Sequence, residues 1–192
     1  MRTISRVGVL GSGVMGGAIA AHLANCGIPS IMLDIVPFDA TDEEKKNPKV
    51  RNSIAAASKA ALFKTKPAPL YKTSNAALIE IGNFDDDMEK IADCDWIVEV
   101  VTERLEIKKI VFENVKKRRK PGSIISSNTS GIAIHSMIDD MDDDMKKNFL
   151  GTHFFNPPRY LKLLEIIPAP DTDPEVVSFM AGFMEDVMGK GV

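Results

Sequence analysis

The chain has 192 residues, of which 44% are hydrophobic and 27% are charged, and its formal net charge is −3. This length allows one substantial domain with a buried core, and the composition excludes a disordered or fibrous chain. The slightly acidic balance gives no sign of a nucleic-acid partner, and no apolar run reaches the roughly 18 residues that a membrane span requires. We expect a soluble cytoplasmic protein in which Cys26 and Cys94 stay reduced.

The first 35 residues predict a strand, a glycine-rich turn, a helix and a second strand. Residues 6–10 form a β-branched apolar run, residues 15–25 are alanine-rich and periodic, and residues 30–35 are apolar again. Such a βαβ opening is typical of a parallel sheet. Further along, we expect strands at 96–101, 123–126, 149–153 and 163–167, and helices at 106–119 and 174–188. The alternation predicts one α/β domain over residues 1–192, a doubly wound, mainly parallel sheet with helices on both faces.

Residues 40–79 interrupt this alternation as a basic excursion of helix and loop. The part from Lys45 to Ile79 contains eight basic residues and no acidic one, and residues 52–63 are alanine-rich enough to form a helix. The basic residues either form a solvated helix face or attract a polyanionic ligand. The second interpretation follows because clustered like charges repel one another unless a counter-charge offsets the repulsion.

A Gly-x-Gly-x-x-Gly turn follows the first strand and opens the first helix. Gly11 allows a tight turn, Gly13 allows the backbone to approach a pyrophosphate, and Gly16 allows the helix to pack close to the strand. The helix N-terminus offers free N–H groups to phosphates. Asp34 ends the second strand, near the position of an acid that binds the adenosine ribose of NAD and repels the extra phosphate of NADP. A turn that binds nothing is the alternative.

His153 and Glu165 are the strongest candidates for chemistry. His153 ends an apolar strand, and ligands of open parallel sheets bind at the carboxyl ends of strands. Glu165 lies inside the next apolar strand, where a carboxylate needs a partner. A histidine held by a carboxylate could act as a general base. A purely structural contact between the two side chains is the alternative.

Two further polar stretches follow predicted strands. Residues 126–131 are either an ordinary turn with a helix N-cap or short donors aimed at a ligand oxygen. Residues 103–108 are compatible with nothing more than the first turn of a helix. The aspartates at 85–87 and 139–144 lack the glycine and the final glutamate of a calcium-binding loop, so we expect solvated turns, helix starts and no metal site.

Several of these stretches together resemble one enzyme family. They are VGVLGSGVMGGAIA (7–20), Asp34, VEVVTERLEIKK (98–109), SIISSNTSGI (123–132) and GTHFFNPPRYLKLLEIIP (151–168). The chain resembles the NAD-binding domain of the L-3-hydroxyacyl-CoA dehydrogenase family. The resemblance implies a Rossmann-type fold and the oxidation of L-3-hydroxyacyl-CoA to 3-oxoacyl-CoA in fatty-acid β-oxidation.

The resemblance also implies roles for individual residues. His153 is the general base that takes the proton of the 3-hydroxyl group while hydride passes to NAD, and Glu165 pairs with it. Ser130 and Asn156 contact the 3-oxygen of the substrate. The cofactor-binding set comprises Gly11, Gly13 and Gly16 at the pyrophosphate, Asp34 at the ribose, and Glu103 with Lys108 on the nicotinamide side.

Coenzyme A carries phosphates that need cations, so the resemblance favours the ligand-binding interpretation of the basic excursion. One of Lys59, Lys64 and Lys66 is expected to contact this part of the acyl-CoA substrate. A related enzyme that oxidises a small hydroxy acid such as L-gulonate is an alternative. A dinucleotide-binding module without turnover is the non-enzymatic alternative.

The family also has a helical domain that follows the NAD-binding domain, closes the cleft and forms a homodimer. This chain stops where that domain would begin, so we expect it to be one part of a longer protein. The sequence of residues 39–79 differs from that expected of the short single-function enzymes. This difference favours the dehydrogenase part of a bifunctional hydratase–dehydrogenase.

Overall fold

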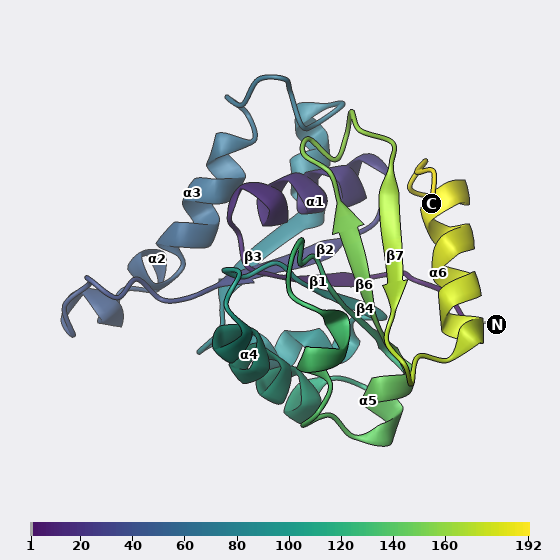
Figure 1. The fold of residues 1–192 in the computed structure, drawn as a ribbon. Coiled ribbons are helices and arrows are strands. Elements are labelled where there is room, and N and C mark those ends of the chain that lie inside the picture. The colour runs from purple at the N-terminus through teal and green to yellow at the C-terminus, as the bar shows by residue number, and fades with distance from the viewer. Residues whose placement is uncertain (1) are drawn as a thin grey trace.

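The computed structural model describes residues 2–192 and contains one seven-stranded sheet with the strand order β3-β2-β1-β4-β5-β6-β7 (Figure 1). All neighbouring strands are parallel except β6 and β7, which are antiparallel. The strands are β1 (Val7–Leu10), β2 (Ser30–Asp34), β3 (Ile79–Asn83), β4 (Trp96–Glu99), β5 (Ile124–Ser127), β6 (Phe149–Phe154) and β7 (Leu164–Pro168). The predicted doubly wound, mainly parallel sheet is therefore confirmed.

Helices cover both faces of the sheet and enclose two apolar cores. The α-helices are α1 (Val14–Asn25), α2 (Pro48–Arg51), α3 (Ser53–Ala61), α4 (Leu105–Arg118), α5 (Asp143–Lys147) and α6 (Pro174–Asp186). Short 3-10 helices are η1 (Glu44–Lys46), η2 (Thr73–Leu78), η3 (Met88–Asp93) and η4 (Ile134–Met137). One core joins α1 and α6 to the sheet and contains Trp96 and Leu23, whereas the other contains Phe112 of α4 and Phe149. Figure 1 shows α1 and α4 on opposite sides of the sheet.

The order of strands places a switch point at the centre of the sheet. β1 pairs with β2 on one side and with β4 on the other, so Val9 lies between Met32 and Val98. The chain therefore winds outward in one direction through β2 and β3, and in the other direction from β4 onward. Ligands of open α/β sheets bind outside the carboxyl ends of the strands at such a point.

Most predicted elements agree with the structure to within one or two residues at each end. The strand β3 was not expected, because Glu80 and Gly82 interrupt its short apolar pattern. β3 is an edge strand in which Glu80 is exposed and pairs with Arg6 and Lys90, so a charge there meets no desolvation cost.

The basic excursion folds as η1, α2, α3 and η2, and ion pairs with nearby acids partly neutralise its positive charge. Arg51 pairs with Asp85 and Asp86, and Lys46 pairs with Glu43. These pairs supply part of the counter-charge that the sequence pattern requires. Asp142, in the second aspartate cluster, caps α5 through the amide of Met145, as expected of a helix start.

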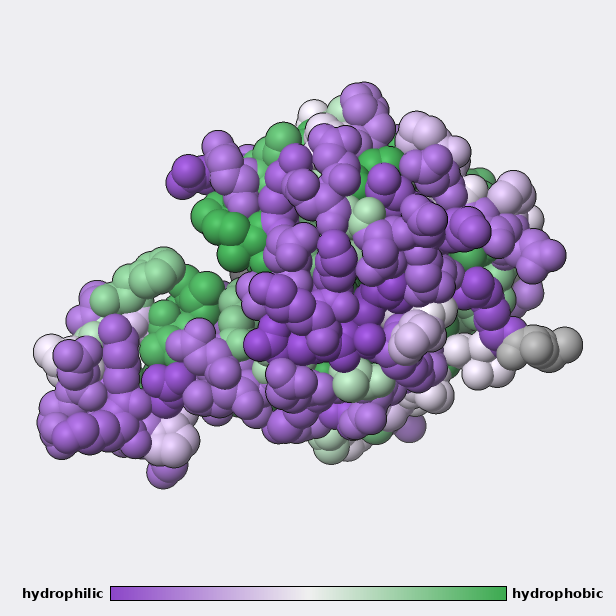
Figure 2. All heavy atoms as spheres, turned by 90° about the horizontal axis from the view of Figure 1, so that it is seen from below, coloured by the Kyte–Doolittle hydropathy of each residue, from purple (hydrophilic) through white to green (hydrophobic). Residues whose placement is uncertain are grey.

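The surface seen from below is mostly hydrophilic, and hydrophobic side chains gather toward the end of the molecule that carries α2 and α3 (Figures 1 and 2). Within residues 2–192, no helix combines the length and apolar character needed to cross a membrane.

Candidate active site

The glycine-rich turn lies between the carboxyl ends of β1 and β4. Gly11 adopts φ +107°, and a Cβ atom there would stand 2.6 Å from the carbonyl oxygen of Val100. A Cβ atom at Gly16 would stand 1.8 Å from the carbonyl oxygen of Gly11, so the third glycine allows the helix to lie against the turn. Gly13 faces open space. Two glycines therefore build the turn, and the middle one leaves its outer side free.

Asp34 braces this turn from the end of β2. One carboxylate oxygen accepts hydrogen bonds from both the amide and the hydroxyl of Ser12, at 2.6 Å each, and the other accepts from the amide of Ile35 at 2.7 Å. The carboxylate is thus held at the rim of the turn. An ionised carboxylate has about four lone-pair sites, so it keeps capacity for a ligand hydroxyl.

The N-terminus of α1 has the features of a dinucleotide site. Gly13 caps the helix without a side-chain hydrogen bond, and its first turn contains no acidic residue. The free N–H groups and the positive end of the helix dipole therefore face the open side of the turn. Val14, in the first turn of α1, and Phe38, after the end of β2, are exposed apolar residues that the sequence patterns do not indicate. The glycine-rich turn, the start of α1 and Asp34 together are compatible with the binding of NAD.

His153 and Glu165 face each other on the antiparallel strands β6 and β7. They are direct partners in the strand register, and Nδ1 of His153 lies 2.7 Å from Oε2 of Glu165. Because a carboxylate only accepts hydrogen bonds, Nδ1 carries the proton and Nε2 of the neutral ring is free to accept. The apolar residues around Glu165 in the sequence suggested a buried carboxylate. In the structure, 51% of the Glu165 side chain is exposed, because β7 is an edge strand.

Ser130 completes a small polar group at the other ring nitrogen. Its Oγ lies 3.1 Å from Nε2 of His153. Asn128, in the same loop after β5, accepts a hydrogen bond from the amide of Phe154 at 2.9 Å and so joins this loop to the end of β6. Asn156 follows β6 and is exposed, and its side chain forms no hydrogen bond with any residue from 2 to 192. The structure therefore brings Ser130, His153 and Glu165 together and leaves Asn156 open to a ligand.

Glu103 holds the Ser130 loop in place. Its carboxylate accepts hydrogen bonds from the hydroxyl of Thr129 and from the amides of Ser130 and Gly131. Partial burial opposes ionisation of Glu103, but these hydrogen bonds and the ammonium of Lys108 outweigh it and lower the pKa of Glu103 to about 2. Glu103 is therefore a carboxylate throughout the neutral range.

Lys108 lies behind Glu103 rather than beside open space. Its side chain is 1% exposed, and its ammonium bridges Glu99 at 2.8 Å and Glu103 at 3.2 Å. Glu99 is fully buried at the end of β4 and also accepts from Ser127 and the amide of Val101. Burial raises the pKa of Glu99, and the Lys108 ammonium opposes that rise. Glu99 is not among the residues predicted from the sequence, although an acid at the end of the apolar strand WIVE is a signal of the same kind as Glu165.

The three lysines expected to meet coenzyme A occupy different settings. The ammonium of Lys59 donates to the carbonyl oxygen of Ile79 at 2.5 Å, so it is tied to the amino end of β3. Lys64 and Lys66 are exposed in the loop after α3. That loop touches the segment after β6, because Arg159 donates to the carbonyl oxygens of Ala68 and Leu70. Lys64 and Lys66 are thus exposed to solvent, whereas the ammonium of Lys59 is held by a backbone carbonyl.

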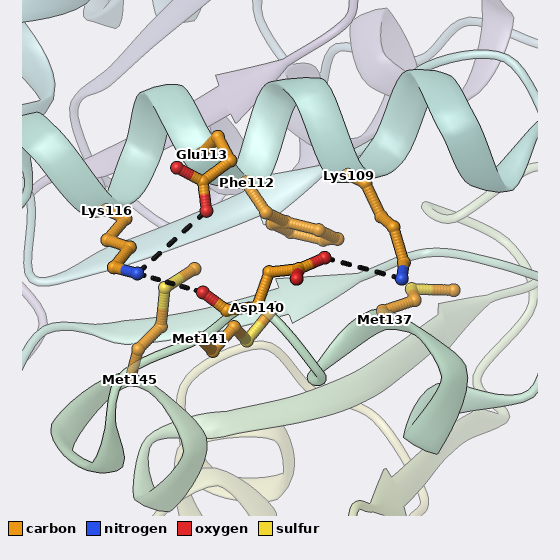
Figure 3. A pocket seen from close by; sticks show the side chains of 8 residues that line it. All are labelled: Lys109, Phe112, Glu113, Lys116, Met137, Asp140, Met141 and Met145. Carbon is orange, nitrogen blue, oxygen red and sulfur yellow. Dashed lines mark hydrogen bonds and ion pairs between the residues drawn. The ribbon is translucent and has the colours of Figure 1, made fainter.

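Two hollows elsewhere do not compete with this site. The first lies between α4 and the segment from η4 to α5, and it leaves only about 10 Å³ of free volume, room for one water at most. Its walls are Lys109, Phe112, Glu113, Lys116, Met137, Asp140, Met141 and Met145 (Figure 3). The second, of about 200 Å³, lies beside Lys120 and Ile124 at the amino end of β5, on the edge opposite to the glycine-rich turn. Met137 and Met145, which line the first hollow, are buried.

Comparison with known proteins reveals relatives along nearly the whole chain. The chain is 54% identical over 195 residues to a probable 3-hydroxyacyl-CoA dehydrogenase of Bacillus subtilis, covering 98% of this chain and 25% of the relative. It is 39% identical over 189 residues to a putative fatty acid oxidation complex trifunctional enzyme of Rickettsia felis, again covering 98% of this chain and 25% of the relative. The chain thus spans about a quarter of the length of each of these two relatives.

The fold is shared with solved structures of the same group. The crystal structure of a 3-hydroxyacyl-CoA dehydrogenase from Archaeoglobus fulgidus matches with a TM-score of 0.75 and 26% sequence identity, covering 98% of this chain and 55% of that protein. The family model for the NAD binding domain of 3-hydroxyacyl-CoA dehydrogenase matches residues 6–192. The chain therefore belongs to the family of 3-hydroxyacyl-CoA dehydrogenase NAD-binding domains.

Proposed function

We propose that this chain binds NAD and supplies the general base of an enzyme that oxidises L-3-hydroxyacyl-CoA to 3-oxoacyl-CoA in fatty-acid β-oxidation. The observation that carries the proposal is the group of Ser130, His153 and Glu165, joined through both ring nitrogens of the histidine. The name of the Rickettsia relative supports the β-oxidation setting. The chain matches only about a quarter of each of these two relatives, which is compatible with its being one part of a longer enzyme. We propose that this enzyme forms a homodimer through its other parts.

The chain's own residues provide for one proton transfer. His153 accepts the proton of the substrate's 3-hydroxyl group at Nε2. In the structure, the Oγ of Ser130 lies within hydrogen-bond distance of this nitrogen. Glu165 keeps the proton of the neutral ring on Nδ1 and stabilises the imidazolium that forms. Ser130 and Asn156 hold the 3-oxygen as it becomes a carbonyl. When bound, NAD supplies the acceptor for the hydride that leaves C3.

The cofactor would be held by groups on the central strands. The N–H groups at the start of α1 would bind the pyrophosphate, and Asp34 would accept from the ribose hydroxyls. Glu103 would lie on the nicotinamide side, with Lys108 as the buried counter-charge that fixes its position. The loop that carries Ser130 is hydrogen-bonded to Glu103. The same loop would therefore position both the cofactor contact of Glu103 and the substrate contact of Ser130.

An acyl-CoA substrate is favoured over a small hydroxy acid by the exposed lysines beside the His153 segment. Lys64 and Lys66 would meet the phosphates of coenzyme A, for which a small acid has no equivalent. A Lys64→Met/Lys66→Met double variant should raise KM for an acyl-CoA several-fold and leave kcat close to that of the wild type. Lys72→Met, an exposed lysine of the same basic segment, is the matched control.

The direct test follows NADH absorbance after acetoacetyl-CoA is added to the protein in its full natural length. Acetoacetate, which has the same reacting carbonyl without coenzyme A, serves as the comparison substrate. We expect rapid oxidation of NADH with acetoacetyl-CoA and little with acetoacetate. Equal rates with both would favour the small-acid enzyme, and NADH binding without oxidation would favour a module without turnover.

A further inference from the structure

Lys190 is a buried cation that the proposed chemistry does not use. It lies near the end of the chain and is 6% exposed. Its ammonium donates to the carbonyl oxygens of Pro158 and Leu161, and it sits 5.7 Å from the ring centroid of Phe154. Within residues 2–192 it has no carboxylate partner. A charge without a counter-ion is costly to bury, so this position calls for an explanation.

The two carbonyl groups belong to the loop that connects β6 to β7, residues 155–163. Strands end on either side of this loop, and no helix lies within it. The backbone next to Lys190 holds the same loop, because the amide of Gly191 donates to the carbonyl oxygen of Lys162 and the amide of Leu164 donates to that of Gly191, at 2.9 Å each. Lys190 and Gly191 therefore hydrogen-bond to this loop and its end, Lys190 through its side chain and Gly191 through its backbone.

The loop carries groups that belong to the candidate active site. Asn156 is its second residue, and the ring of Phe155 lies 4.6 Å from the ring of His153. Carbonyl groups that point into the protein need a donor, and Lys190 supplies three N–H donors from one point. A single side chain thus satisfies two inward carbonyls and fixes the path of the loop after Asn156.

We propose that Lys190 is a positioning residue that holds the 155–163 loop in place and thereby sets Asn156 beside His153. The proposal rests on the proposed function for its effect on the reaction, but its structural half stands on the loop alone. Burial also lowers the pKa of Lys190, in line with an ammonium that is held by carbonyl groups rather than by an opposite charge.

The test combines amide hydrogen exchange with steady-state kinetics of Lys190→Met in the protein of full natural length. We expect exchange in residues 155–163 to rise at least tenfold, while exchange in β1 and β2 and the Kd for NADH stay within twofold of the wild type. The kcat for acetoacetyl-CoA should fall at least tenfold. Lys162→Met, an exposed lysine on the same loop, is the matched control and should change none of these values.

If Lys190→Met fails to fold, Lys190→Gln keeps an uncharged amide with two N–H donors on a shorter side chain and should give the same pattern at smaller amplitude. Three results would overturn the proposal: wild-type exchange in the loop, exchange raised equally throughout the sheet, or a loosened loop with wild-type kcat. Failure of the proposed function would show differently, as a wild-type protein that does not oxidise NADH with acetoacetyl-CoA. In that case the exchange in residues 155–163 still decides whether Lys190 holds the loop.

Discussion

The candidate site contains two acid–base pairs of almost equal length in opposite surroundings. Lys108 and Glu99 meet at 2.8 Å with 1% and 0% of their side chains exposed, whereas His153 and Glu165 meet at 2.7 Å with 17% and 51% exposed. The first pair joins the end of β4 to α4, and the second joins two strands at the edge of the sheet. Distance alone does not tell these pairs apart, but exposure does.

This difference is the basis on which we assign a structural role to the first pair and propose a chemical role for the second. A buried pair is satisfied on all sides, so Lys108 and Glu99 have no free direction from which a ligand could approach. In the more exposed pair, Nε2 of His153 lies near the surface, where Ser130 is its only hydrogen-bond partner among residues 2–192. Glu103 connects the two, because it contacts Lys108 on one side and the amide of Ser130 on the other.

The largest effect on stability is expected from Lys108→Met. The substitution leaves Glu99 buried without its counter-charge, which should lower the free energy of unfolding by about 3–5 kcal/mol. Urea unfolding followed by the fluorescence of Trp96, the only tryptophan, would measure it. Lys109→Met removes a neighbouring lysine with partly exposed pairs and should cost less than about 1 kcal/mol. Equal losses in both variants would contradict the assigned roles.

Glu165→Gln should lower kcat strongly and change the stability of the fold little, in contrast to Lys108→Met. The amide oxygen can still accept from Nδ1 of His153, but it carries no charge to stabilise the imidazolium, so kcat should fall roughly tenfold to a hundredfold. The free energy of unfolding should change by less than about 1 kcal/mol, because the pair is half exposed. Glu80→Gln, at an exposed acid on the far edge strand, is the control for kcat.

The effect of replacing Glu103 should depend on pH. Its pKa is lowered from 4.5 to about 2 in the folded chain, so its contribution to stability is complete above pH 4.5 and is lost as the pH falls toward 2. Wild-type protein should therefore lose more stability across that window than Glu103→Gln. Unfolding curves at several pH values between 5 and 2 would measure the difference. Parallel curves for the two proteins would show that the carboxylate contributes nothing.

The sequence predicts the central part of the fold well because that part depends on local patterns. The glycine turn, the alanine-rich α1 and the apolar β1 and β2 each follow from periodicity or from a single residue type. The pairing of His153 with Glu165 was also within reach, because the two residues flank one connection between adjacent strands. Their chemical role stays a prediction.

The remaining features depend on how distant segments meet. Lys108 reaches Glu99 only because the connection from β4 to α4 folds the helix back over the strand end, which no spacing rule shows. Lys190 stands between two glycines in a stretch that resembles a flexible end, and only the contact with the 155–163 loop explains its burial. Lys59 belongs to the same basic run as Lys64, yet a backbone carbonyl of β3 holds its ammonium.

The measurement that tests the central claim most directly is the rate at which His153→Gln oxidises NADH with acetoacetyl-CoA, compared with the wild type at saturating concentrations of both. Because a general base contributes about 10²–10⁴-fold, we predict a fall in kcat of at least a hundredfold, with the Kd for NADH within twofold of the wild-type value. A variant that binds NADH and keeps the wild-type rate would contradict the account, because His153 would then not be the base.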